Sequence, residues 1–154
     1  MNADSVTITV LEPTGKLAEG EAEYVELPVE GGDMAVYPGH TSAVCGLRPG
    51  HVRISSSDLP ELLAISGGYC EIVRTPSAGA GEEGAEGRLH SRVTVCARTA
   101  EQPSEIDHAR AREAERRALD RLTQPAPDID LARARAALAR ARARLSVIGG
   151  GDHA

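Results

Sequence analysis

Arginines recur at matching positions in the last third of the chain, where they could bind an anionic ligand. Residues 105–122 and 128–145 repeat one pattern, with eleven of eighteen paired positions identical. At about 100° per residue, the three repeated arginines of each copy fall within about 40° of one another on a helix. Guanidinium groups beside the carboxylate of Asp107 would suit a polyphosphate, because each planar fork donates two hydrogen bonds to anionic oxygens. The repeated arginines are Arg110, Arg117 and Arg121 in the first copy and Arg133, Arg140 and Arg144 in the second.

A solvated charged surface is the alternative explanation of the same stripes. Charge runs on helices are usually exposed, and a pair such as Glu113 with Arg117, four residues apart, stabilises a helix without any ligand. The pattern of residue types alone leaves both explanations open.

Two helices must position these arginines. Ala and Arg are strong helix formers, and the short connection with Pro125 and Pro127 predicts an antiparallel helical hairpin. We expect Ser104 to cap the first helix, with Asp107 completing a capping-box-like arrangement, and the glycines at 149–151 to end the second. A small-residue face that lets two helices approach closely would consist of Ala132, Ala136, Ala139 and Ala143.

The first hundred residues consist of short β-rich runs separated by turn-forming residues. These runs cover 6–10, 24–29, 51–55, 62–66, 69–74 and 92–97. The Gly, Pro and Asp clusters between them favour an antiparallel sandwich or barrel over a parallel α/β sheet. We therefore predict an α+β chain, with an antiparallel β-sandwich over 1–100, a two-helix hairpin over 101–148 and a disordered tail over 149–154.

A glycine-rich stretch resembles a dinucleotide-binding motif without its context. Residues 79–84 fit the pattern G-x-G-x-x-G, but no helix-forming run follows them. Glu82, Glu83 and Glu86 would also repel a pyrophosphate. The Gly/Glu-rich stretch 75–90 is therefore expected to be a flexible loop between two strands.

Composition argues against several classes of function. The 154 residues include no Trp or Phe and only three Tyr, so the core must be aliphatic and aromatics that stack on nucleic-acid bases are scarce. The net charge is −6, with 7 basic and 14 acidic side chains in residues 1–100 and 10 basic and 8 acidic in residues 101–148. Because phosphate neutralisation needs a basic footprint, the acidic body argues against nucleic acid as a partner.

Targeting, metal and catalytic signals are weak. The N-terminus has no basic segment and no long apolar run, so we expect neither a signal peptide nor a membrane span, and a cytoplasmic chain. Cys45, Cys70 and Cys96 are odd in number and far apart, which favours reduced, buried thiols. We predict no metal site, no required cofactor and no catalytic residue, because no metal-ligand spacing or nucleophile–base grouping is evident.

Four segments of the sandwich region carry a resemblance to a known family. They are residues 24–40 (YVELPVEGGDMAVYPGH), 47–50 (LRPG), 66–72 (SGGYCEI) and 92–95 (RVTV). Their Pro-Gly and Gly-Gly steps mark tight turns, where Gly supplies positive φ and Pro fixes its own φ. Joined to the arginine hairpin, this order of segments resembles the epsilon subunit of bacterial F-type ATP synthase over nearly the whole chain.

The resemblance implies a sandwich of about ten strands followed by two helices, in the central stalk of a proton-translocating rotary ATP synthase. It implies a non-catalytic subunit, peripheral at the cytoplasmic face of the bacterial cell membrane and not inserted in it. The sandwich would contact the gamma subunit and the c-ring and help couple their rotation to catalysis. The implied partner-contact residues are Asp33, Tyr37 and His40, although a turn or packing role is the alternative for Asp33 and His40.

The same resemblance gives the hairpin a regulatory role. In the family, the hairpin either folds onto the sandwich or extends along gamma into the alpha/beta head, where it inhibits ATP hydrolysis. Some members bind ATP in the folded hairpin through an Ile/Leu-Asp-x-x-Arg-Ala motif, which residues 106–111 match. ATP is thus implied as a regulatory ligand that is not hydrolysed there. The implied ATP-binding residues are Glu101, Ile106, Asp107, Arg110, Ala111, Arg117, Arg140 and Arg144.

In this implied site the adenine base lies near Ile106 and Ala111, and the arginines hold the phosphates. Asp107 and Glu101 accept hydrogen bonds. Two segments depart from the family pattern: the stretch 75–88 resembles an insertion without a family role, and residues 41–44 replace a more usual apolar segment.

Two other classes of protein are weighed against this one. A free-standing ATP-sensing or protein-interaction module would keep the hairpin site but would not co-purify with gamma. A coiled-coil adaptor would need sustained apolar heptads, which the alanine–arginine repeat lacks.

Overall fold

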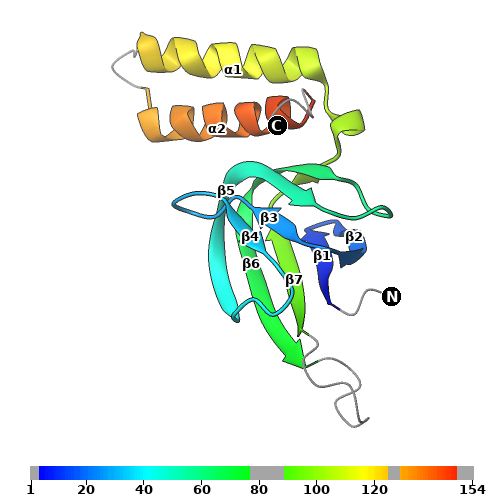
Figure 1. Cartoon of the computed structure of the whole chain (residues 1–154). Helices are drawn as coiled ribbons and strands as arrows, with labels where there is room; N and C mark the ends of the chain where they lie inside the picture. Colours follow the sequence, from blue (N-terminus) through cyan, green and yellow to red (C-terminus); the bar gives the residue numbers. More distant parts are fainter. Residues whose placement is uncertain (1–3, 77–88, 125–128, 149–154) are drawn as a thin grey trace, which may run out of the picture.

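The computed structural model describes residues 4–76, 89–124 and 129–148. Figure 1 shows a β-sandwich with a pair of antiparallel helices lying across one end of it. The predicted order of a sandwich followed by a helical hairpin is therefore confirmed. The predicted tail at 149–154 and most of the predicted loop at 75–90 fall outside the described residues.

The sandwich is built from one sheet of eight strands, in the order β2-β1-β7-β6-β5-β3-β4, with β8 pairing with β6. Neighbouring strands are antiparallel except β1 and β7, which run parallel, so the expectation of a purely antiparallel sandwich is corrected at this pair. The strands are β1 (Ser5–Glu12), β2 (Gly15–Ala22), β3 (Val25–Leu27), β4 (Met34–Val36), β5 (Ala43–Ile54), β6 (Leu62–Pro76), β7 (Leu89–Ala97) and β8 (Ala100–Glu101).

The described residues contain eight strands rather than the roughly ten that the resemblance implies, and two of the runs read from the sequence join into one strand. The runs at 62–66 and 69–74 are parts of β6, which continues through Gly67 and Gly68. Both glycines have positive φ, and a Cβ on Gly68 would lie 2.1 Å from the carbonyl oxygen of Cys96. Only glycine fits that close approach, so the pair bends the strand without ending it. The long, curved β5 and β6 thereby contribute to both layers of the sandwich.

Aliphatic side chains fill the sandwich, as the composition predicts. In β1, Val6, Ile8 and Val10 are fully buried and alternate with partly exposed threonines, which is the two-residue period of a half-buried strand. Tyr24 and Tyr37 stack with their ring centroids 5.2 Å apart. Hydrogen bonds from the backbone N–H of Glu23 to the carbonyl of Ser55 and from the N–H of Ser55 to the carbonyl of Tyr24 join the ends of β2 and β5.

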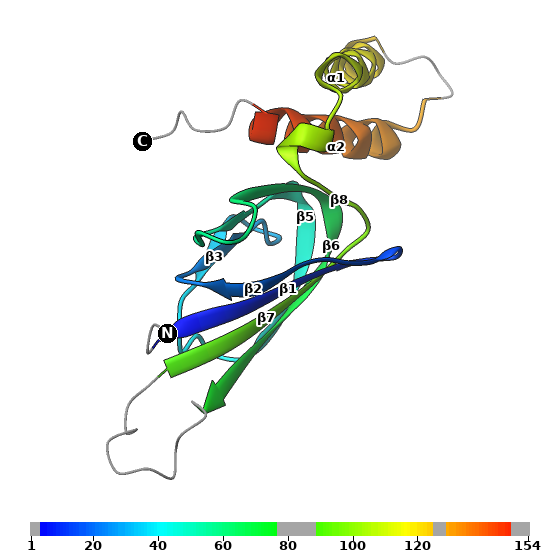
Figure 2. The ribbon, with the colours of Figure 1, turned by 90° about the vertical axis from the view of Figure 1, so that its right-hand side faces the viewer.

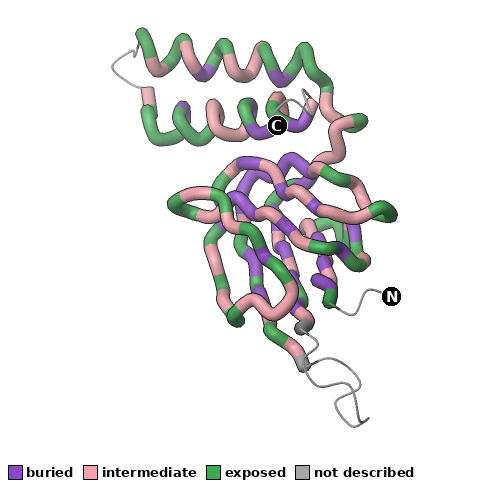
Figure 3. Tube along the Cα trace, in the orientation of Figure 1, coloured by how far each residue is buried: buried purple, intermediate pink, exposed green. Residues whose placement is uncertain are grey.

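The helical part begins with a short 3₁₀ turn, η1 (Pro103–Glu105), followed by α1 (His108–Thr123) and α2 (Leu131–Ile148). In both Figure 1 and Figure 2, α2 lies between α1 and the sandwich. It packs against α1 on one side and against β5 and β6 on the other, so the hairpin is folded onto the sandwich. Figure 3 shows buried positions throughout the sandwich and more sparsely along the helices. None of the described helices is long and apolar enough to cross a membrane.

Candidate functional site

Equivalent aspartates of the repeat start the two helices. The Asp107 carboxylate accepts a hydrogen bond from the backbone N–H of Arg110 at 2.9 Å, and that of Asp130 accepts one from the N–H of Arg133 at 3.0 Å. Such caps satisfy an N–H that has no partner inside the helix. The expectation that Ser104 caps the first helix is wrong, because Pro103 first starts the separate turn η1.

Alanines at equivalent positions of the repeat form the contact between the helices. Ala111 and Ala118 are buried on α1, and their counterparts Ala134 and Ala141 are buried on α2. The predicted small-residue face is therefore corrected, since of its four alanines only Ala143 is buried. That residue lies, with Val147, on the side of α2 that meets the strands. Alanine recurs so often in α2 that its spacing could not reveal which side faces α1.

The alanine contact places both arginine stripes on one side of the hairpin. Two copies of one helical sequence that run antiparallel and bury equivalent residues are related by an approximate two-fold axis, so equivalent side chains point to the same side. We call this side the arginine face, and it consists of Arg110, Arg117, Arg121, Arg133, Arg140 and Arg144. Ala114 and Ala137, also equivalent, are partly buried between the two stripes.

Carboxylates neutralise the arginine face only in part. The guanidinium of Arg144 binds Glu101 at 2.5 Å, and that of Arg117 binds Glu113 at 3.3 Å. A hydrogen bond from Arg116, together with the charges of Arg116 and Arg117, lowers the pKa of Glu113 below its ordinary value. Within the part of the chain that the structure describes, Arg110, Arg121, Arg133 and Arg140 form no ion pair. The face therefore keeps guanidinium groups available for an anion.

Three of the predicted ATP-binding residues converge where α2 meets the sandwich. Glu101, Arg140 and Arg144 line a narrow cavity with residues of β6 and the nearby Thr99, and this cavity is too tight to hold a water molecule. Small-molecule sites usually enclose about 300–1,000 Å³, so a nucleotide would have to lie mainly over the open arginine face. Ser66 and Thr99, which the sequence did not single out, add polar groups to this cavity.

The other predicted ATP-binding residues lie on the connector and on α1. Ile106 is partly exposed after η1, Asp107 caps α1, and Arg110 is exposed in its first turn. Arg117, the next arginine of the α1 stripe after Arg110, is also exposed. Ala111 is buried in the contact between the helices, so its side chain supports the site from within the hairpin.

The three predicted partner-contact residues lie on both sides of the short strand β4. Asp33 precedes β4 and binds Arg48 of β5 at 2.5 Å, whereas Tyr37 and His40 follow it. Tyr37 is 56% exposed, and the His40 ring lies 2.8 Å from the carbonyl oxygen of Thr41. Asp33 is thus turned towards β5 and is separated from the other two by β4.

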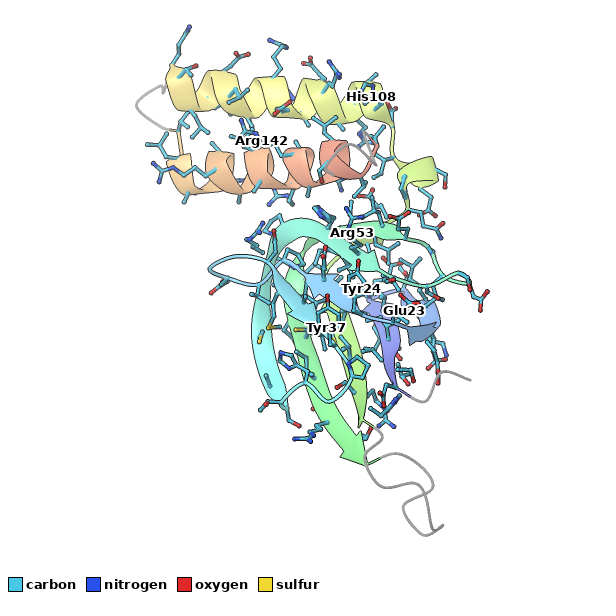
Figure 4. The ribbon with its side chains drawn as sticks, viewed as in Figure 1. Glu23, Tyr24, Tyr37, Arg53, His108 and Arg142 are labelled. Atoms are coloured by element: carbon cyan, nitrogen blue, oxygen red, sulfur yellow. The ribbon has the colours of Figure 1, made fainter. Side chains whose placement is uncertain are left out.

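A second hollow, of about 500 Å³, lies in the sandwich and is lined in part by Tyr24, Arg53 and Glu23 (Figure 4). Arg53 is held by Glu26 at 3.3 Å and by Glu61 at 3.2 Å. Glu21, Glu23 and Asp58 also line this hollow, so it would repel phosphate. Across residues 4–76, 89–124 and 129–148, no cluster of three or more His, Cys, Asp or Glu side chains is arranged to hold a metal ion.

Comparisons with known proteins cover both parts of the chain. Residues 5–75 match the family described as ATP synthase, Delta/Epsilon chain, beta-sandwich domain, and residues 104–149 match ATP synthase, Delta/Epsilon chain, long alpha-helix domain. The chain is 34% identical over 145 residues to the ATP synthase epsilon chain of Bacillus velezensis and 35% identical over 145 residues to that of Bacillus subtilis. Each alignment covers 94% of this chain and 98% of the relative.

Solved structures share the fold at low sequence identity. A chain in the Euglena gracilis mitochondrial ATP synthase (OSCP/F1/c-ring) has a TM-score of 0.69 at 19% identity, covering 92% of this chain and 79% of that one. A chain in the central stalk and c-ring of the Tetrahymena thermophila mitochondrial ATP synthase has a TM-score of 0.52 at 11% identity, covering 93% and 96%.

Proposed function

Because the chain belongs to the family of ATP synthase epsilon chains, non-catalytic subunits of the F-type central stalk, we propose that its hairpin is an ATP-sensitive brake on ATP hydrolysis. In the folded hairpin, the arginine face binds ATP. When ATP leaves, α2 separates from the sandwich and the helices extend along the gamma subunit into the alpha/beta head. The observation that carries this proposal is the gathering of Glu101, Arg140 and Arg144 on the same side of the hairpin as the stripe of α1.

Both helices of the hairpin would contribute side chains to ATP binding. Arg140 and Arg144 of α2 and Arg110 and Arg117 of α1 hold the phosphates, because planar guanidinium groups suit bidentate contacts with anionic oxygens. Glu101 releases Arg144 to the phosphates and accepts a hydrogen bond from the nucleotide. A ligand held by both helices binds only while the hairpin is closed.

The regulation follows from binding to one of two states. A ligand that binds only the folded hairpin stabilises it by RT ln(1 + [L]/Kd), which is about 2.7 kcal/mol at a ligand concentration of 100 Kd. The contact that opposes opening is modest, since α2 meets the strands mainly through small residues such as Ala143 and through Val147, whose full burial contributes roughly 1.5–3 kcal/mol. An energy of this size from ATP is enough to decide which state is populated.

The test is a calorimetric titration of the isolated chain with ATP. We expect saturable binding that Arg140→Ala with Arg144→Ala abolishes. The matched control is Arg112→Ala with Arg116→Ala, which removes two arginines from the exposed outer side of α1 and should bind ATP within about twofold of the unchanged chain. Absence of saturation at millimolar ATP, or equal loss in both double variants, would contradict the proposed nucleotide site.

The sandwich would attach the subunit to the stalk and c-ring at the membrane's cytoplasmic face. Val44 of β5 and Tyr69 of β6 are 73% and 55% exposed and lie on the same outward face of paired strands. Large apolar side chains exposed together commonly mark protein interfaces, so this face would pack against gamma, with Tyr37 and His40 nearer the c-ring. Val44→Asp should lower co-purification of the chain with the membrane-bound complex, and unchanged recovery would remove this face from the interface.

A further inference from the structure

A basic groove separates β5 from α2 on the side of the hairpin opposite the arginine face. It has a volume of about 480 Å³ and runs past Arg48, His51, Arg135, Leu138, Arg142 and Ser146. Pro49, Ala139 and Ala143 supply further small or apolar surface. This volume falls within the range of small-molecule sites, about 300–1,000 Å³. The groove exists only while α2 lies on the sandwich, because each element supplies one wall.

The charge of the groove is entirely positive. Three arginines and one histidine line it, and none of its lining residues is acidic. Arg48 is paired with Asp33, and Arg142 reaches from α2 towards α1 to bind Glu115 at 3.1 Å (Figure 4). Arg135 forms no ion pair with any residue in the described ranges. The two carboxylates offset part of this charge, and an anion in the groove would be attracted to the charge that remains.

The repeat shows that one of these charges, that of Arg142, is specific to the second helix. Arg135 corresponds to Arg112 of α1, whose guanidinium donates a hydrogen bond to His108 at 3.0 Å. Arg142 corresponds to Leu119, so the arginine is one of the positions at which the two copies differ. On α1, which packs mainly against α2, an arginine here would face no strand. On α2 it faces β5.

We propose that this groove binds a small phosphorylated anion, at a site separate from the arginine face. The guanidinium groups of Arg48, Arg135 and Arg142 would contact the phosphate oxygens, while Leu138 and Ala139 would lie against any ring that the ligand carries. Since one wall belongs to α2 and the other to β5, the bound anion holds the hairpin on the sandwich. It therefore favours the folded state independently of a nucleotide on the arginine face.

The experiment follows backbone amide resonances of the full chain during titration with inorganic pyrophosphate at constant ionic strength. We expect saturable shifts at Gly50 and His51. Arg135→Gln with Arg142→Gln should raise the pyrophosphate Kd at least tenfold. The matched control, Arg133→Gln with Arg140→Gln, removes the same charge from the other side of α2 without breaking the ion pair of Arg144 with Glu101, and should leave that Kd within about twofold.

Arg135→Gln alone tests the site with little risk of a folding defect, because Arg135 is exposed and forms no ion pair with the residues that the structure describes. This single substitution should raise the Kd at least threefold. A parallel titration of the control variant with ATP, followed at Gly50 and His51, identifies the ligand class. Tighter binding of ATP than of pyrophosphate indicates a nucleotide, and equal binding indicates a bare polyphosphate. Absence of saturable shifts at millimolar pyrophosphate, or equal weakening in the groove and control variants, would overturn the site without touching the ATP proposal.

Discussion

Asp107 and Asp130 occupy the same position in the two copies of the repeat and cap their helices in the same way. Residues 129–134 match the Ile-Asp-x-x-Arg-Ala pattern as fully as residues 106–111 do. Only Asp107, however, follows the connector that leads from Glu101, whereas Ile129 and Asp130 lie at the other end of the hairpin. Substitutions at the two positions can therefore distinguish the loss of a helix cap from the loss of a ligand contact.

Replacing either aspartate by alanine should destabilise its helix to a similar extent. Loss of an Asp cap costs about 1 kcal/mol, so Asp107→Ala and Asp130→Ala should lower the free energy of unfolding about equally in urea titrations followed by circular dichroism. Only Asp107→Ala should weaken ATP binding, by about tenfold or more. Equal ATP affinities for the two variants would show that Asp107 is a cap and nothing further.

At the scale of the elements, the hairpin depends on four equivalent alanines that let the helices approach closely. Ala141 is 2% exposed against α1, whereas Ala136 is exposed on the same helix. A larger side chain at the buried position would push the helices apart and also spread the two arginine stripes.

Ala141→Leu should therefore destabilise the folded hairpin, by about 1–3 kcal/mol as for other overpacked contacts. Ala136→Leu adds the same atoms at an exposed position and should change the free energy of unfolding by less than about 0.5 kcal/mol. Chemical denaturation of both variants measures the difference. If Ala141→Leu were as stable as Ala136→Leu, the alanine contact would not be what closes the hairpin.

The repeat predicted the stripes and the hairpin because arginine spacing and helix propensity are local properties. The alanines that contact α1 were predicted wrongly, because alanine occurs on several sides of α2. Which of these sides packs against α1 is decided only by the tertiary structure. It also divided β6 into two strands at Gly67 and Gly68, since a glycine pair predicts a turn as readily as a bend within a strand. The parallel pairing of β1 with β7 depends on contacts distant in sequence, which no local pattern encodes.

The candidate site shows the same division between local and tertiary information. The spacing of Arg140 and Arg144 was enough to place them on one stripe, but their approach to Glu101 depends on how α2 lies on β6 and β8. The basic groove was not predicted at all. Arg48 and Arg142 are far apart in the sequence, and the only local signal was the replacement of the Leu119 position by arginine in the second copy.

At the scale of the whole molecule, an acidic sandwich carries a basic hairpin through a contact of small side chains. Residues 1–100 hold an excess of carboxylates, and residues 101–148 an excess of arginines. The hairpin is tied to the β-domain by the ion pair between Arg144 and Glu101 and by the contact of Ser146 with His51 at 3.4 Å. Contacts so few suit the proposed movement of the hairpin, because a ligand energy of a few kcal/mol would then decide its position.

Under the proposed function, the hairpin must leave the sandwich to inhibit ATP hydrolysis. His51→Cys with Ser146→Cys, joined by a short thiol crosslinker, would lock it in the folded state within the assembled complex. The measurement is the rate of ATP hydrolysis at low ATP, with each single-cysteine variant, treated alike, as a control for the native thiols. We predict that the locked complex loses the inhibition that the unlocked one shows at low ATP. Equal inhibition in the locked and unlocked complexes would contradict the account.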